Sequence, residues 1–445
     1  MNKPVYTPAT LAAGNFKKYH WPELNRLHLT FGDIEPVLNT LARSGEIDCQ
    51  LLGHSYAGVP IQRLSIGRGP RNILAWTQMH GDEATATAAV LDWLHWLNSG
   101  ADTGLPADWK QRVSIHIIPM LNPDGAAQCT RHNAQGIDIN RDALGLQTPE
   151  GAILMSQAQL LEPEVAFNLH DQNAYYSVGE TAHPSTIAFL APAFNTEKQV
   201  DDARYRAKQL IACMQEAIRH WLPNEVARYD DTYSKRCFGD NIAALSISTI
   251  LIESGAGWDD PHRQTARKMN VVALHSALAA LLDGSYRNYT PKDYYHIPEN
   301  REDGFCDLKI EALTVPGRHL FVADMAINID RHSGEARIAA IGDLCVMQGF
   351  KTLRQPALQL CPRKGFAITG PMTLDDSEYL QLMREGVGYF YGDANELNIQ
   401  TTLPVLVVSA PLPELPMPGD QACLLLSKPD SAPHLAILNG QPVEF

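Results

Sequence analysis

Two histidines and two glutamates stand at or just beyond the ends of short apolar runs: His80, Glu83, His170 and Glu253. An ionisable group among apolar residues is costly to bury unless it has a partner or a chemical role. A His, Glu, His set gives a metal ion three protein ligands and leaves a fourth tetrahedral position open, as in catalytic rather than structural zinc sites. These residue types therefore predict a catalytic zinc site formed by His80, Glu83 and His170.

The remaining glutamate suits a different role in the same site. Water activated by a metal needs a nearby base that is not itself bound to the metal. Glu253 fits that need, because it follows its apolar run directly. His80 and Glu83 also have a simpler interpretation, since a His and a Glu three residues apart occur by chance in many proteins and Asp82 or Glu83 could cap a helix. The metal hypothesis thus depends on all four residues meeting at one place.

Two arginines follow the strong turn sequence Asn122-Pro-Asp-Gly, at Arg131 and Arg141. The planar guanidinium group suits carboxylates and developing oxyanions. Two such groups near a metal therefore suggest a substrate that carries a free carboxylate. The alternative for both arginines is surface salt bridging.

From about residue 40 to residue 283, apolar runs alternate with helical patterns. This alternation predicts an α/β domain whose central sheet is mixed, mostly parallel and flanked by helices. The functional crevice of an open α/β sheet lies at the carboxyl ends of its strands, where the ionisable residues stand. The helix after the first run is predicted to hold Asp82 and Glu83 in its first turn. The predicted strands are 72–77, 113–121, 165–169 and 249–252, and the predicted helices are 82–98, 201–222 and 263–282.

The polar, proline-containing segment 283–304 interrupts the helical pattern and predicts a domain boundary. A chain of 445 residues is too long for one ordinary core. We therefore expect a catalytic domain with its N-terminal lead-in over 1–290 and a smaller β-rich domain, a sandwich or barrel, over 300–445. The short runs that predict its strands are 308–315, 319–329, 336–341, 403–409 and 422–426.

Composition narrows the possible partners and the compartment. There are 36 Lys and Arg residues against 50 Asp and Glu residues, a formal charge of −14, which repels phosphate backbones and argues against nucleic acid. The first twenty residues hold no continuous apolar run, and no later segment has the length of a membrane-spanning helix, so we expect no membrane partner and a cytoplasmic location. The eight cysteines are scattered singly and are interpreted as reduced thiols.

The order of the chemical residues resembles that of the M14 zinc carboxypeptidase family. The family's pattern of HxxE, an arginine, Asn-Arg, a lone His at a strand end and a catalytic Glu is met in full. The segment 122–141, with Asn-Pro-Asp-Gly, Arg131 and then Asn-Ala-Gln-Gly-Ile-Asp-Ile-Asn-Arg, is its most specific part. The resemblance covers about residues 45–282 and does not include the C-terminal domain.

This resemblance implies a zinc-dependent metallocarboxypeptidase that hydrolyses the C-terminal amide bond of peptides or peptide-like substrates. It implies one Zn²⁺ per chain, bound by His80, Glu83 and His170. Glu253 would act as general base and then as general acid, and Arg131 would polarise the scissile carbonyl group.

The resemblance also implies how the substrate is held. Asn140 and Arg141 would bind its terminal carboxylate, so the expected partner is a peptide or acyl-amino-acid substrate with a free carboxylate. A tyrosine usually closes over the substrate in this family, with Tyr233 as the candidate here and Tyr229 as its rival. Asp142 follows Asn-Arg where an Asn and an aromatic residue are common, and no residue that selects the substrate side chain is indicated.

Two alternatives remain open at this point. A deacylase or amidase resembling aspartoacylase and succinylglutamate desuccinylase, or an amidase of cell-wall peptides, would use the same metal chemistry. The segment 122–141 favours the peptidase. A binding module that has lost activity would be expected to lack at least one of the four chemical residues, and none is missing. The sequence does not indicate the oligomeric state.

Overall fold

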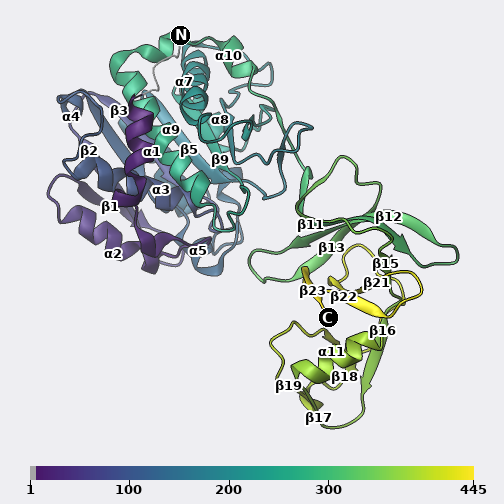
Figure 1. Cartoon of the computed structure of the whole chain (residues 1–445). Helices are drawn as coiled ribbons and strands as arrows, with labels where there is room; N and C mark the ends of the chain where they lie inside the picture. The colour runs from purple at the N-terminus through teal and green to yellow at the C-terminus, as the bar shows by residue number, and fades with distance from the viewer. Residues whose placement is uncertain (1–6) are drawn as a thin grey trace. The chain divides into compact units, whose positions relative to one another are not determined.

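A computed structural model describes residues 7–445, which divide between two compact units, 1–302 and 303–445 (Figure 1). Residues 1–6, part of the first twenty residues on which the expected cytoplasmic location rests, lie outside the described residues. Within the described part of the chain, no helix combines the length and the apolar character needed to cross a membrane.

The first unit is built on a mixed sheet. Among residues 7–302, eight strands follow the order β1-β2-β4-β3-β5-β9-β7-β8, with parallel pairing from β4 through β3 and β5 to β9. Antiparallel pairs flank this centre, so the predicted mixed α/β architecture is confirmed. The strands are β1 (Asp48–His54), β2 (Pro60–Gly67), β3 (Arg71–Thr77), β4 (Val113–Ile118), β5 (Val165–Asp171), β7 (Ile187–Leu190), β8 (Val226–Arg228) and β9 (Ser248–Ser254).

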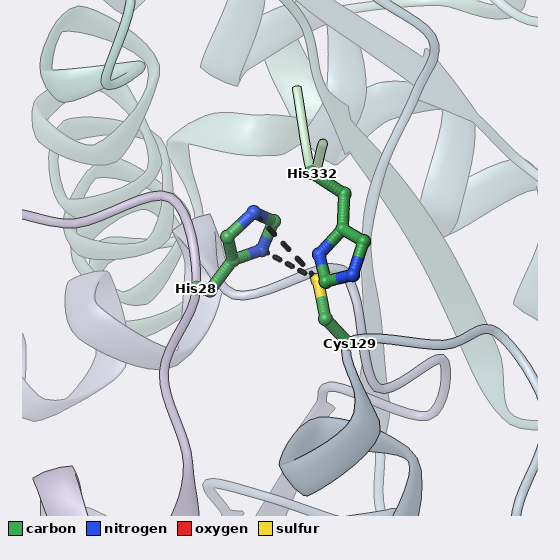
Figure 2. Close-up of side chains that lie close together, drawn as sticks. All are labelled: His28, Cys129 and His332. Atoms are coloured by element: carbon green, nitrogen blue, oxygen red, sulfur yellow. Dashed lines mark hydrogen bonds between the residues drawn. The ribbon is translucent and has the colours of Figure 1, made fainter. Parts of the chain in front are cut away.

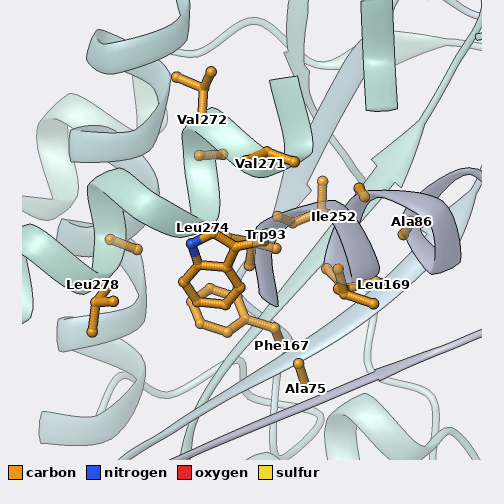
Figure 3. Packing of buried hydrophobic residues seen from close by; sticks show 14 of the residues in the cluster. Ala75, Ala86, Trp93, Phe167, Leu169, Ile252, Val271, Val272, Leu274 and Leu278 are labelled. Atoms are coloured by element: carbon orange, nitrogen blue, oxygen red, sulfur yellow. The ribbon is translucent and has the colours of Figure 1, made fainter. Parts of the chain in front are cut away.

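Helices cover both faces of this sheet, which explains why its central strands are almost continuously apolar. One core includes residues of α1, α3, α7 and α9, and a second includes residues of α6 and α8. Figure 3 shows part of the first core, with Trp93, Phe167 and Leu169. Because side chains alternate along a strand, Asn168 and His170 of β5 point to the opposite face. The helices are α1 (Thr7–Tyr19), α2 (Phe31–Ala42), α3 (Thr85–Asn98), α6 (Pro149–Leu161), α7 (Asp202–Ile218), α8 (Phe238–Ala243) and α9 (Gln264–Asp283).

One boundary differs from the sequence prediction in a way that matters for the site. Helix α3 begins at Thr85, so Asp82 and Glu83 precede the helix and the prediction that they lie in its first turn is wrong. The backbone N–H of Glu83 instead closes a turn by donating to the carbonyl of His80 at 3.2 Å. This turn brings the side chains of His80 and Glu83 back over the edge of the sheet.

A buried ion pair joins the two helices that follow the glutamates. Arg267 of α9 donates from Nε and Nη2 to both oxygens of Asp92 in α3, at 2.7 and 2.8 Å. The two side chains are 1% and 0% exposed. Helix α3 starts two residues after Glu83, and α9 follows the loop after β9, the strand that carries Glu253. The ion pair therefore fixes the relative position of the two helices that adjoin the carboxylates.

The second unit contains an eight-stranded sheet, counted over residues 303–445, that is largely antiparallel. It also contains α11 (Asp376–Arg384) and a parallel sheet of β16 (Lys364–Ile368), β18 (Val387–Gly392) and β20 (Val407–Val408). Of these elements the short apolar runs indicated only β20, which lies within 403–409. The assignment of this unit as a sandwich or barrel stays a prediction. The larger sheet holds β11 (Phe305–Val315), β12 (Phe321–Ile329), β13 (Ala336–Gly342), β14 (Gln348–Leu353), β15 (Gln359–Leu360), β21 (Cys423–Ser427), β22 (Pro433–Leu438) and β23 (Gln441–Glu444).

A buried histidine provides a second link between α3 and α9. The Nε2 of His275 lies 2.8 Å from the carbonyl oxygen of Thr103, and the indole N–H of Trp93 donates to its Nδ1 at 3.3 Å. These partners require a neutral imidazole with its proton on Nε2. Burial lowers the pKa of His275 from 6.5 to about 4, so protonation is coupled to unfolding.

The stability of the first unit should therefore fall as the pH is lowered from 7.5 to 5, because the unfolded state binds a proton at His275 that the folded state does not. The contribution of this histidine is about 2 kcal/mol over that range. His275→Leu should be less stable at pH 7.5 but should have a flatter pH dependence. Urea unfolding followed by tryptophan fluorescence measures this, since all seven tryptophans lie in residues 1–302. An unchanged slope in the variant would contradict the assignment.

Candidate functional site

Strand register brings the chemical residues together. In the parallel pairing of β5 with β9, His170 lies directly opposite Glu253. Strand β3 pairs with β5 so that Thr77 lies opposite Leu169, and the loop after β3 reaches the same edge with His80. A cavity of about 340 Å³ opens there. The predicted site residues that line it are His80, Glu83, Arg131, Asn140, Arg141, His170 and Glu253, with Tyr229.

The carboxylate of Glu83 bridges the two histidines. Its Oε1 lies 2.6 Å from Nδ1 of His80, and its Oε2 lies 2.7 Å from Nδ1 of His170. The nitrogen and oxygen donor atoms of the three residues lie within 4.8 Å of one another. All three residues are buried, at 2%, 9% and 2% exposed for His80, Glu83 and His170. The structure therefore places the predicted ligand set in one compact group.

Asp138 orients the first histidine. Its Oδ1 lies 3.2 Å from Nε2 of His80, and a carboxylate at that nitrogen favours a proton on Nε2. Nδ1 faces the Glu83 carboxylate at 2.6 Å, so a proton or a metal ion must lie between these two atoms. This donor set, with a carboxylate behind one ligating imidazole, fits a divalent zinc ion.

The electrostatics of the cluster agree with that requirement for positive charge. Burial by itself disfavours the ionised form of Glu83, but His80 and His170 more than offset this and hold its pKa below the usual range. Burial likewise lowers the pKa of His80, and the opposing effects of Glu83 and Asp138 raise it overall to about 9. The site thus stabilises a cation next to an ionised carboxylate.

Glu253 has a different environment. Its Oε2 atom is buried and has no hydrogen-bond partner among residues 7–445. Burial, followed by the negative charge of Glu83, raises the pKa of Glu253 well above its usual range. A carboxyl group that accepts a proton readily and has a free oxygen, in the cavity that the ligand cluster also lines, has the properties of a general base.

The arginines lie on the side of the cavity formed by 131–141. Arg131 donates from Nε to Asp138 at 2.9 Å, and its Nη1 lies 3.2 Å from Nδ1 of His80. Arg141 donates from Nη1 to the carbonyl of Asn140 at 2.8 Å and to the sulfur of Cys237 at 3.1 Å. Neither arginine is confined to a surface salt bridge, and both present their cationic groups to the cavity lining.

The two candidate tyrosines are separated by the structure. Tyr229 lines the cavity, whereas Tyr233 is absent from the described cavity lining. The hydroxyl group of Tyr229 lies 3.3 Å from that of Tyr176, and burial with this hydrogen bond keeps its pKa above the usual range. Sequence spacing alone did not distinguish them, because the segment 229–234 is irregular and its side chains follow no regular period.

Several lining residues were not identified from the sequence. Asp171, directly after His170, accepts hydrogen bonds from the backbone N–H and hydroxyl group of Thr85, and burial raises its pKa to about 6. Its position at the end of an apolar run was the available signal. Asp138 and Asn168 also adjoin the predicted residues, the latter through the two-residue period of β5.

The turn sequence Asn122-Pro-Asp-Gly has a structural role. Asn122 caps the short helix α5 (Pro123–Gln128) by accepting from the N–H of Gly125, and its amide donates to the carbonyl of Met79 at 3.2 Å. A Cβ atom on Gly81 would meet the backbone of Gly125 at 1.9 Å. The two glycines therefore let this turn pack against the loop that carries His80.

A cysteine at the end of α5 has an imidazole partner. The sulfur of Cys129 lies 2.8 Å from Nδ1 of His28 (Figure 2). None of the eight cysteines forms a disulfide within residues 7–445. Cys129 and Cys237 are only partly buried and make polar contacts, so neither acts simply as a small buried hydrophobic residue.

Comparison with known families supports the interpretation of the site. Residues 34–157 match the model of the peptidase M14 family, described as zinc carboxypeptidase. The predicted resemblance to zinc carboxypeptidases is confirmed. The matched segment includes His80, Glu83, Arg131 and Asn140–Arg141, and it ends before His170.

Individual relatives were also found. Carboxypeptidase SOL1 of Arabidopsis thaliana is 27% identical over 167 residues, 33% of this chain, which spans about a third (34%) of that curated relative. Among solved structures, a metallo-carboxypeptidase from Burkholderia cenocepacia is 16% identical with a TM-score of 0.46 and coverage of 57% of this chain and 70% of that one. Carboxypeptidase A from Helicoverpa armigera is 14% identical with a TM-score of 0.45 and coverage of 62% and 80%.

The ligand geometry predicts close to one zinc ion per purified chain, measured by elemental analysis. His170→Ala removes one of three converging donors and should lose most of the metal. His132→Ala is a matched control, because His132 is an exposed histidine near Arg131 whose side chain does not line the cavity. The ligand assignment would be wrong if the wild-type protein contained no transition metal, or if His170→Ala kept its full zinc content.

Proposed function

We propose that this chain is a zinc-dependent metallocarboxypeptidase that hydrolyses the C-terminal amide bond of peptides or peptide-like substrates. The observation that carries the proposal is the free, buried Oε2 of Glu253, directly across the strand pair from His170 and beside the cluster centred on Glu83. A proton-accepting group next to a metal-binding set is what metal-assisted hydrolysis requires. The family match supports the peptidase over the deacylase alternatives.

Glu253 is the residue that moves the proton in this mechanism. Zinc bound by His80, Glu83 and His170 would supply a Lewis acid and lower the pKa of a bound water molecule. Glu253 accepts the proton of the attacking water at its free carboxylate oxygen. The same oxygen then delivers the proton to the nitrogen of the departing amine, which restores the carboxylate for the next cycle.

The arginines and Asn140 hold the substrate. Arg141 and Asn140 bind the terminal carboxylate, with the Oδ1 of Asn140 fixed by the N–H of Phe238 at 2.9 Å so that its amide nitrogen can donate. Arg131, held by Asp138, stabilises the negative charge that develops on the carbonyl oxygen. The roles of the two arginines thus differ in the stage at which they act.

Tyr229, rather than Tyr233, is the tyrosine placed to contact substrate, because it lines the cavity. We interpret residues 1–290 as the catalytic domain and residues 300–445 as a β-rich domain of unknown role. The proposed substrate is a peptide or an acyl-amino acid, with no nucleic-acid or membrane partner. The proposed location is cytoplasmic.

Glu253→Gln keeps the size of the side chain but removes the proton acceptor. Turnover of a peptide substrate should fall by about 10²–10⁴-fold, while zinc content and substrate binding remain. The melting temperature is measured on the same preparation. If Glu253 had only a structural role, the variant would be less stable but would keep its activity. A variant that holds zinc and keeps more than a tenth of the wild-type turnover would contradict the mechanism.

The assignment of Arg141 predicts selectivity for a free C-terminus. Wild-type protein should cleave a peptide acid far faster than the matching C-terminal amide. Arg141→Ala should mainly raise KM for the acid, whereas Arg131→Ala should mainly lower kcat, by roughly 10²–10³-fold. Equal rates of the wild type on acid and amide would exclude the carboxylate-binding role.

A further inference from the structure

The floor of the cavity contains an amide that has no partner in the protein. Asn168 of β5 is 1% exposed, and neither Nδ2 nor Oδ1 forms a hydrogen bond with any residue of the described chain. Across the sheet it lies opposite Trp76 of β3 and Leu251 of β9, so both strand neighbours present large apolar side chains. The amide is thus a single polar group in an otherwise apolar row.

Leaving a buried amide unpaired costs roughly 1–3 kcal/mol for each unmet group, and such groups need an explanation. Here the explanation lies in position. Asn168 is two residues before His170 on the same face of β5, and it lines the same cavity. A ligand that enters the cavity would supply the hydrogen bonds that the protein leaves unmade.

A glycine in α8 keeps this part of the cavity open. A Cβ atom on Gly239 would lie 3.4 Å from Nδ2 of Asn168 and 3.3 Å from Cγ of Pro192. The preceding residue, Phe238, donates its N–H to Asn140, which is assigned to the terminal carboxylate. The beginning of α8 therefore links the carboxylate-binding residues to Asn168, and the side chain of the terminal residue would point into this part of the cavity.

The next residue of α8 adds a negative group to the same lining. Asp240 is 8% exposed, and its Oδ1 accepts the N–H of Ser234 at 2.9 Å. The positive charges of Arg204 and Arg141 act on Asp240 and partly oppose the effect of its burial. Burial raises its pKa to about 6, so it is ionised at pH 7.5. The lining arginines, Arg131 and Arg141, are assigned to other groups of the substrate, so Asn168 and Asp240 are the acceptors that this region offers a substrate side chain.

We propose, resting on the carboxypeptidase function above, that Asn168 and Asp240 determine specificity for a C-terminal residue whose side chain ends in a hydrogen-bond-donating nitrogen, as an amine or amide. Asn168 pairs with this nitrogen through Oδ1, and Asp240 adds attraction for a cationic amine. An apolar side chain would leave Asn168 unpaired, and an acidic side chain would be repelled by Asp240.

Zinc-loaded protein is assayed at pH 7.5 on N-acylated dipeptides that differ only in the C-terminal residue: Lys, Gln, norleucine and Glu. We expect kcat/KM for Lys and Gln to exceed that for norleucine, an apolar chain of similar length, by at least about 10-fold. Glu should be the poorest substrate. Preference for norleucine over both Lys and Gln would overturn the inference while leaving the peptidase function intact.

Three variants assign the preference to residues. Asn168→Leu should bring kcat/KM for the Lys and Gln dipeptides to within about threefold of the value for norleucine. Its melting temperature should be at or above that of wild type, because an unpaired amide is removed. Asp240→Asn keeps the hydrogen bond to Ser234. It should lower kcat/KM for the Lys dipeptide at least about fivefold relative to that for the Gln dipeptide. Thr249→Val, a buried site on β9 two residues before Leu251 and outside the cavity lining, is the control and should keep the wild-type preference.

The outcomes separate the two levels of the proposal. If zinc-loaded wild type cleaves none of the four dipeptides, the proposed function fails. If cleavage occurs and Asn168→Leu folds with the wild-type ranking unchanged, the specificity assignment fails alone. Should Asn168→Leu not fold, the wild-type ranking and Asp240→Asn still decide the inference, because each has its own contrary result.

Discussion

The parallel alignment of β3, β5 and β9 is the constraint on which the site depends. Parallel strands end at the same edge of a sheet, so residues far apart in sequence meet only if the register is correct. Here His170 is paired with Glu253 across the β5–β9 boundary, and the loop after β3 adds His80 and Glu83. A shift of one residue would turn these side chains toward the apolar core on the other face. The buried cores on both faces therefore also hold the chemistry in place.

The site concentrates opposite charges that would be unstable separately. Glu83 is kept ionised by two imidazoles, whereas Glu253 is pushed toward its protonated form by burial and by the charge of Glu83. Two glutamates in one cavity thereby acquire different chemical properties, one as a ligand and one as a proton carrier. The buried pair of Asp92 and Arg267 keeps the helices beside these glutamates in fixed positions.

Much of this site could be predicted because the residue types carry strong chemical preferences. His80, Glu83, His170 and Glu253 stand beside apolar runs, where an ionisable group needs a partner, and the central strands follow from those runs. The placement of Glu83 in a helical turn was wrong, since a local backbone hydrogen bond to His80 outcompetes helix formation there. The second unit was harder, because its short runs do not distinguish parallel from antiparallel pairing.

The sequence by itself determined the ligand types, their order along the chain and the apolar runs that carry them. Only the tertiary structure decided which tyrosine reaches the cavity, that Asp138 orients His80, and that Asn168 lies unpaired on the cavity floor. The physical reason is that hydrogen bonding and desolvation depend on neighbours brought from distant segments. An asparagine inside a strand has the same local pattern whether its amide is satisfied or free, so its role appears only when β3, β9 and α8 surround it.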